Sequence, residues 1–536
     1  MGVADKDTKA VQTDSSGEFS AEQINYVYEN RRYVGRKETI AYVMFDMAQS
    51  ININKYSGRF VNNILQIDFS LQKLATFING IWDIINDIFT GAIVDKTRTR
   101  WGKFKPYLIG LGIPGTMGAI IYWLMPLFFP QTGPKDLNKF LMYLILAVVR
   151  EGVDTFRGIA QTGMLATITP HPVDRTRLIT IANFASSFLG EKLPEQIMTL
   201  LLDLIGNGII KSETKSITQI YTSLFVSMGV ITSIISGAFS LYFFFVTRER
   251  VLQSVKKPSV MQGIKSILNN KPILLLTLSQ TLSGLSVGGG KQDYFIDVLN
   301  FATLAAFTGL PGSIVHPISY SLVPWFRRKF SSRTLYILGA YIGDILMVPV
   351  FFVGAIGGKK NGLYKKIIPM AIALTVWETV FMLFYGVRKV IPSELYNEAM
   401  DYCEWKNGYR TEAMTSVAKG LATKLASLFS NMVQLQIKKL IKYDQTLYIS
   451  GKQQSDDTKF GLFAMFTIVP FATTSLGIIP MLFYDLGGEK RERMYAELLA
   501  RRAEMSQSAT SGSAEDLERL AEMQMKVGEK NKNKEL

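Results

Sequence analysis

Two aspartates, Asp83 and Asp87, stand four residues apart in an apolar stretch that begins at Phe69. On a helix, residues with this spacing lie on one face, one turn apart. Two like charges on one face repel each other, and each is costly to bury in a membrane. The pair therefore predicts a site that a proton or a small cation neutralises. The alternative is that a buried arginine or lysine pairs with both carboxylates and only holds helices together.

The chain has the composition of a membrane protein. Of its 536 residues, 48% are hydrophobic and 19% are charged, whereas soluble proteins average about 25% charged residues. Apolar runs of about 20 residues, enough for one bilayer crossing, recur along it. The expected fold class is an all-α membrane protein with about 12 transmembrane helices in two six-helix halves. The runs lie at about 38–63, 69–94, 106–130, 138–166, 178–206, 217–246, 272–298, 302–326, 333–357, 364–390, 412–436 and 459–485.

The charged segments between these runs divide the chain. Residues 1–36 are polar and lack the apolar core of a cleaved signal peptide, so we expect them to stay cytoplasmic. The two bundles are predicted at 37–246 and 272–486, joined by a charged, partly amphipathic cytoplasmic linker at 247–271. The tail, 487–536, is predicted to be cytoplasmic and to contain a helix with solvated charges. The expected location is therefore the cell membrane, crossed several times, with both termini inside.

Several function classes are disfavoured by the composition. The formal net charge is +15, but Lys and Arg gather in the connections between apolar runs, as the positive-inside bias requires. No nucleic-acid partner is therefore expected. One cysteine and two histidines make a zinc or haem site improbable, and no nucleophile–base–acid set indicates an enzyme. We expect a monomer whose partners are membrane lipid and a small-molecule substrate.

Three motifs resemble one transporter family. WDIINDIFTGAIVDKTRTRWGKFKPY at 82–107, TITPHPVDRTRL at 167–178 and MDYCEWKNGYRTE at 400–412 occur in that order. They resemble the signatures of the glycoside–pentoside–hexuronide:cation symporters, the family of the melibiose permease, in the major facilitator superfamily. The hydrophobic layout agrees over about residues 37–490. The resemblance implies the major facilitator fold and cation-coupled sugar symport.

The resemblance also implies a cation site. Family members bind sodium, lithium or a proton through a carboxylate pair on the second helix, which Asp83 and Asp87 match. Asn86 matches a neighbouring asparagine, and an ungapped alignment places Thr155 on a threonine of the fourth helix. All four residues offer oxygen, which suits a hard cation. The expected coupling ion is Na⁺ or H⁺, with Li⁺ possible, and no other cofactor is expected.

The expected substrate site departs from the family. An aspartate and a tryptophan that hold the sugar fall on Gly158 and Thr162, and an arginine falls on Asn183. A family lysine is kept as Lys424, while a nearby glutamine becomes Lys419. Intramembrane charges mark a transport pathway or form structural ion pairs, and Arg150 with Asp154 is such a pair by spacing. Asp344 and Glu378 have no predicted partner. The remaining substrate candidates are Asp46, Lys55, Arg59, Asp154 and Arg157.

Two motifs are candidates for cytoplasmic gating. Gly91 allows close helix approach, and Asp95 can pair with basic residues as the halves rock; topology and stability alone are the alternative. The further candidates in these motifs are Arg98, Arg100, Asp401, Glu404 and Arg410.

The predicted function is cation-coupled symport of a glycoside by alternating access. Because the pocket gains amines relative to a neutral-sugar site, an acidic glycoside such as a hexuronide is the preferred substrate hypothesis. Two alternatives stay open: a lysophospholipid-type lipid carrier, and a membrane sensor that binds a ligand without transporting it.

Overall fold

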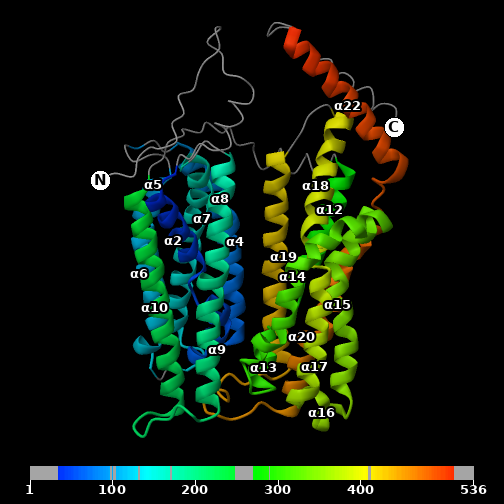
Figure 1. The fold of residues 1–536 in the computed structure, drawn as a ribbon. Helices are drawn as coiled ribbons and strands as arrows, with labels where there is room; N and C mark the ends of the chain where they lie inside the picture. Colours follow the sequence, from blue (N-terminus) through cyan, green and yellow to red (C-terminus); the bar gives the residue numbers. More distant parts are fainter. Residues whose placement is uncertain are drawn as a thin grey trace, which may run out of the picture.

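The computed structural model describes residues 34–96, 99, 104–130, 133–168, 172–247, 268, 270–288, 290–407 and 412–511. Two helical bundles stand side by side in Figure 1, the N-terminal half in blue to green and the C-terminal half in green to orange. We call the end that carries α5 and α22 the proximal end, and the opposite end, with α13 and α16, the distal end.

The N-terminal half is built from helices of very different lengths. Its elements are α2 (Arg36–Ser50), η1 (Asn54–Tyr56), α3 (Ser57–Arg59), η2 (Phe60–Ile64), α4 (Phe69–Lys96), α5 (Lys105–Gly110), α6 (Gly112–Phe128), α7 (Leu137–Ile168), α8 (Pro172–Ala185), η3 (Ser186–Lys192), α9 (Leu193–Gly206) and α10 (Ile217–Val246).

The C-terminal half is similar and adds a helix from the tail. Its elements are α12 (Lys271–Gly284), α13 (Lys291–Asp297), α14 (Leu304–Lys329), α15 (Ser332–Ala355), α16 (Gly358–Asn361), η4 (Leu363–Lys365), α17 (Ile367–Leu383), α18 (Tyr385–Asn407), α19 (Glu412–Leu440), α20 (Asp456–Thr474), η5 (Ser475–Gly477), α21 (Ile478–Leu482) and α22 (Gly488–Ser511).

Each predicted apolar run coincides with one helix or with consecutive helices. Among the described residues, five segments are long and apolar enough to cross a membrane: Lys105–Phe128, Ile217–Val246, Ser332–Ala355, Ile367–Lys406 and Asp456–Leu482. Other long helices, including α4, α7 and α19, carry more charge along their length. The count of twelve crossings stays a prediction.

The first helix of each half is broken. In the N-terminal half α2 ends at Ser50, and η1 and α3 follow after a short irregular segment. In the C-terminal half α12 ends at Gly284 and α13 starts at Lys291. Side chains of α19 satisfy carbonyl groups in this second break, because Ser430 donates to the Ser286 oxygen and Gln434 to the Gly288 oxygen. Broken helices at corresponding positions of two halves are typical of transporters that bind a substrate between them.

Aromatic packing fills each half, while apolar side chains cover the outside. Phe60 packs on Trp123 with ring centroids 4.7 Å apart, and Tyr294 stacks on Phe466 at 5.3 Å. Phe245 and Ile368 are each 73% exposed. Large apolar side chains this exposed suit a surface that faces lipid rather than water.

The tail forms the predicted helix, α22, but one of its faces is not solvated. Met494 and Leu498 are buried in the same apolar cluster as Tyr402 of α18. The indole nitrogen of Trp405 donates to Glu497 Oε2 at 2.7 Å. Arg491 pairs with Glu398, whose side chain is 2% exposed. The solvated-helix prediction was therefore wrong for this face, since a pattern of charges does not show what the apolar residues between them contact.

Burial also affects the ionisation of the docked face. It raises the pKa of Tyr495 to about 12, and the nearby charge of Glu398 acts in the same direction. The phenol therefore stays protonated near neutral pH and donates to Asp401 Oδ2 at 3.4 Å.

Replacing Met494 and Leu498 together with alanine should release α22 from α18. Each truncation removes a fully buried side chain, a change that costs about 2–5 kcal/mol. Limited proteolysis of the purified protein should then cleave the tail faster. Arg493→Ala, at a side chain that is 75% exposed, is the control and should leave the cleavage rate unchanged. Equal rates in all three proteins would contradict the docking.

Candidate functional site

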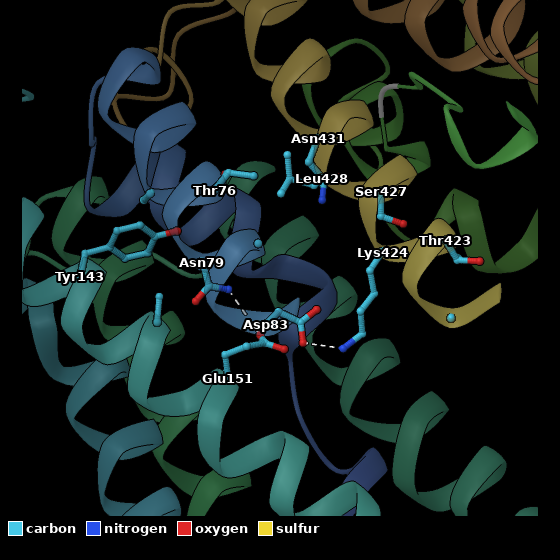
Figure 2. A pocket seen from close by; sticks show the side chains of 14 residues that line it. Thr76, Asn79, Asp83, Tyr143, Glu151, Thr423, Lys424, Ser427, Leu428 and Asn431 are labelled. Atoms are coloured by element: carbon cyan, nitrogen blue, oxygen red, sulfur yellow. Dashed lines mark hydrogen bonds and ion pairs between the residues drawn. The ribbon is translucent and has the colours of Figure 1, made fainter. Parts of the chain in front are cut away.

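A cavity of about 700 Å³ lies between α4 and α7 of the N-terminal half and α19 of the C-terminal half. Figure 2 shows Asp83, Asn79, Glu151 and Lys424 pointing toward one another across it. The lining consists of Ala75, Thr76, Asn79, Gly80, Asp83, Tyr143, Ala147, Glu151, Gly420, Thr423, Lys424, Ser427, Leu428 and Asn431.

A single ammonium group bridges the predicted carboxylate pair. Lys424 Nζ lies 2.6 Å from Asp83 Oδ1 and 2.6 Å from Asp87 Oδ2. The lysine belongs to α19 and both aspartates to α4, so the contact joins the two halves. The structure thus shows the pairing that the sequence left open as an alternative. Lys424 and Asp83 line the cavity, and the lysine side chain is 33% exposed, so this contact is not sealed in a core.

A third carboxylate faces the same cavity from α7. Asn79 Nδ2 donates to Glu151 Oε2 at 3.4 Å, and Glu151 is close enough to Asp83 for their charges to interact. The other polar atom of Asn79, Oδ1, is buried and has no hydrogen-bond partner in the described part of the chain. An unpaired buried acceptor is costly. A ligand that donates a hydrogen bond to this oxygen would remove that cost.

The other two predicted cation ligands point elsewhere. Asn86 is buried, and its Oδ1 accepts from Thr90 Oγ1 at 3.1 Å. Thr155 Oγ1 donates to the Glu151 carbonyl oxygen at 3.0 Å, within its own helix. Neither residue lines the cavity, and within the described residues no group of three His, Cys, Asp or Glu side chains is arranged to hold a metal. The oxygens nearest the ammonium are those of Asp83 and Asp87.

Most of the predicted substrate residues lie away from the cavity. Asp154 pairs with Arg150 at 3.5 Å, as predicted, and with Arg157 at 3.9 Å. Asp46 accepts from Ser186 at 2.6 Å. Gly158 and Asn183 are exposed on α7 and α8. The side chains of Thr162 and Lys419 lie outside the described residues.

Lys55 and Arg59 lie at the distal end, and both are neutralised. Lys55 Nζ is 2.8 Å from Glu191 and 2.8 Å from Glu195, beside a smaller pocket of about 220 Å³. Arg59 pairs with Asp297 at 2.6 Å. The described amines that suggested a cationic pocket are therefore each held by carboxylates, and the sequence could not reveal this because their partners lie far along the chain.

Several functional residues were missed, although a signal for them exists. Asn79 and Thr76 share the helical face of Asp83, and Ser427 and Asn431 share that of Lys424, at three- and four-residue spacings. Extending these two faces predicts much of the lining. Glu378 and Asp344, which had no predicted partner, contact Lys291 at 3.2 Å and Thr474 at 2.6 Å.

The gating candidates are described only in part. Gly91 and Asp95 lie in α4, but their side chains are outside the described residues, as are Arg98, Arg100 and Arg410. Asp401 is buried beside α22, and Glu404 is half-buried on α18. Their gating role stays a prediction.

Comparison with known proteins identifies the family. Residues 38–488 match the family described as MFS/sugar transport protein. The chain belongs to this family. It is therefore an integral membrane transporter of the major facilitator fold and not an enzyme, and the predicted resemblance is confirmed.

The relatives below match this chain over most of their own length, and their names describe a transporter or a carrier. It is 23% identical to an isoprimeverose transporter of Lactiplantibacillus pentosus over 89% of this chain and 94% of that protein. It is 24% identical to the glucuronide carrier protein homolog of Escherichia coli, over 78% of this chain and 85% of that protein. A solved structure of the nucleoside transporter NupG superposes with a TM-score of 0.50 at 11% identity, covering 84% of this chain and 98% of that one. That likeness shows the fold alone.

Gly80→Ala should destabilise the transporter where α4 meets α19. A Cβ at Gly80 would overlap the side chain of Leu428, and overpacking of this kind costs about 1–3 kcal/mol. The thermal unfolding midpoint of the purified protein should fall, and Gly80→Ala with Leu428→Ala should recover part of the loss. Gly118→Ala, where a Cβ meets nothing within 4 Å, should not lower the midpoint. An unfolding midpoint that falls as much in Gly118→Ala as in Gly80→Ala would contradict a close helix contact at Gly80.

Proposed function

We propose that this protein is a secondary active transporter that couples Na⁺ or H⁺, with Li⁺ also accepted, to the movement of a sugar or glycoside by alternating access. The observation that carries the proposal is the ammonium of Lys424 between Asp83 and Asp87. A position built for one positive charge, placed between the two halves and beside a large cavity, suits a coupling ion.

Lys424 acts in this scheme as a tethered stand-in for the coupling cation. While the cation is absent, the lysine neutralises both carboxylates and ties α19 to α4. A cation that enters between Asp83 and Asp87 takes over this neutralisation and releases the ammonium into the cavity. Ion and substrate then favour each other, because each contributes to the same rearrangement and such coupling is reciprocal.

The cavity lining supports a hydroxyl-rich substrate. Asn79, Asn431, Thr76 and Ser427 offer amide and hydroxyl groups, and Tyr143 offers an aromatic face. The relatives named as an isoprimeverose transporter and a glucuronide carrier homolog favour a sugar or glycoside. An acidic substrate such as a hexuronide would need the amine of Lys424, so we expect it to bind only after the cation has displaced that lysine.

We further propose that the protein works as a monomer in the cell membrane. The proximal end, with α22, faces the cytoplasm and the distal end faces outward, in agreement with the basic connections of the sequence.

Asp83→Asn and Asp87→Asn should each abolish cation-driven accumulation in proteoliposomes, because an amide cannot supply the negative charge that the cation requires. Asp344→Asn is the matched control: it is an intramembrane aspartate outside the cavity, and an amide oxygen can still accept from Thr474. It should retain accumulation. Uphill transport that persists in both Asp83→Asn and Asp87→Asn would refute the proposed ion site.

Lys424→Gln should strengthen cation binding, since it removes the internal competitor for Asp83 and Asp87. We expect the apparent dissociation constant for the cation to fall by about tenfold or more, which corresponds to about 1.4 kcal/mol. Cation-dependent thermal shifts of purified protein measure this without transport. Unchanged or weaker binding would show that the lysine does not stand in for the ion.

A further inference from the structure

Four charged side chains meet between the halves at the distal end; three are buried, and the fourth, Asp293, is 15% exposed. Arg59, from α3, lies 2.6 Å from Asp297 and 3.3 Å from Asp293 of α13. Lys438 of α19 lies 2.6 Å from Asp293. Two positive and two negative charges therefore form one group, which we call the distal charge cluster.

The distal charge cluster is shielded from water. The side chains of Arg59 and Asp297 are 2% and 1% exposed, and that of Lys438 is 8% exposed. Tyr443 donates to Asp297 Oδ2 at 3.1 Å, and the guanidinium of Arg59 lies 4.5 Å from the ring centre of Tyr448. A buried ion pair adds little net stability, but leaving one partner buried without the other is costly. Such a cluster fixes the relative position of the two halves at the distal end.

The cluster joins the segments that follow the two helix breaks. Arg59 follows the break in the first helix of one half, and Asp293 and Asp297 follow the corresponding break in the other. A second buried contact lies alongside: the Asp203 carboxylate accepts from the backbone N–H groups of Ala302 and Thr303, both at 2.6 Å.

The cluster lies on the distal side of the cavity. Asn431 of α19 lines the cavity, and Lys438 lies about 10 Å further along the same helix by its rise per residue. The joined segments α3 and α13 therefore lie between the cavity and the distal end.

We infer that Arg59 and Asp297, supported by Asp293 and Lys438, form a charge-balanced latch that holds the distal end shut and separates in each transport cycle. Separation leaves Arg59 on one half and a net negative group on the other, because Asp293, Asp297 and Lys438 all belong to the C-terminal half. These four are positioning residues: they set which end is open and do not contact the substrate. The inference rests on the proposed alternating access.

The test measures opening with a cysteine placed in the cavity. Cys403 is the single cysteine, so Cys403→Ala with Asn431→Cys gives one reporter. Reconstituted protein of known orientation is labelled with a membrane-impermeant maleimide from the distal side. Arg59→Met with Asp297→Asn keeps the Lys438–Asp293 pair and the charge balance. It should raise the labelling rate by about tenfold or more, since a buried pair between the halves is lost.

Three variants complete the test. Exchange of the charges, Arg59→Asp with Asp297→Arg, should return labelling toward the starting rate. Lys55→Met breaks two ion pairs inside one half at the same end and should not change the labelling rate. Arg59→Lys, which keeps the charge but loses the forked contact, is a milder variant that should give an intermediate rate if the double variant does not fold.

The outcomes separate the latch from the proposed symport. The latch would be overturned by an unchanged labelling rate in both Arg59→Lys and the Arg59→Met, Asp297→Asn double variant. An equal rise in Lys55→Met, or no recovery of the labelling rate after charge exchange, would also overturn it. Labelling needs no transport, so the latch can hold in a protein that fails to accumulate substrate with a cation. Loss of accumulation in Asp83→Asn with the predicted labelling intact would support the ion site and the latch separately.

Discussion

The structure depends on the cost of an unneutralised charge inside a membrane. Asp83 and Asp87 share one helical face, so their charges add, and Lys424 from the opposite half supplies the balancing charge. This contact does two things at once: it makes the carboxylates tolerable, and it brings α19 against α4. The proposed ion site and the contact between the halves are therefore one feature, so a bound cation would alter the relative position of two large bundles.

The same constraint explains other charges within the bundles. Arg59 meets Asp297, and Lys291 meets Glu378. The excess of amines in the sequence suggested a cationic pocket, but the described amines that led to that hypothesis are each held by acids. What distinguishes the cavity is its mixture of amide, hydroxyl and carboxylate groups around one lysine that another cation could release.

Much of the fold could be predicted from the sequence, because apolar run lengths and the three motifs depend on local order along the chain. The carboxylate pair of the candidate ion site, Asp83 with Asp87, was predictable for the same reason. The partner of that pair was not, since Lys424 lies on another helix and the alignment suggested contact with a substrate. Arg59 and Asp297 likewise come together only through the packing of the halves. Glu151 and Asn79 fall between these cases: their helical faces were readable, but which faces enclose the cavity depends on tertiary packing.

The docking of α22 bears on how the chain is assembled. Synthesis proceeds from the N-terminus, so α18 is complete well before Arg491 is made. Until then the buried carboxylate of Glu398 has no counter-ion from the tail, and the apolar surface around Tyr402 has no cover from Met494 and Leu498. A chain that ends before Arg491 thus exposes an apolar surface that α22 otherwise covers. This surface is covered only once the residues of α22 have been made.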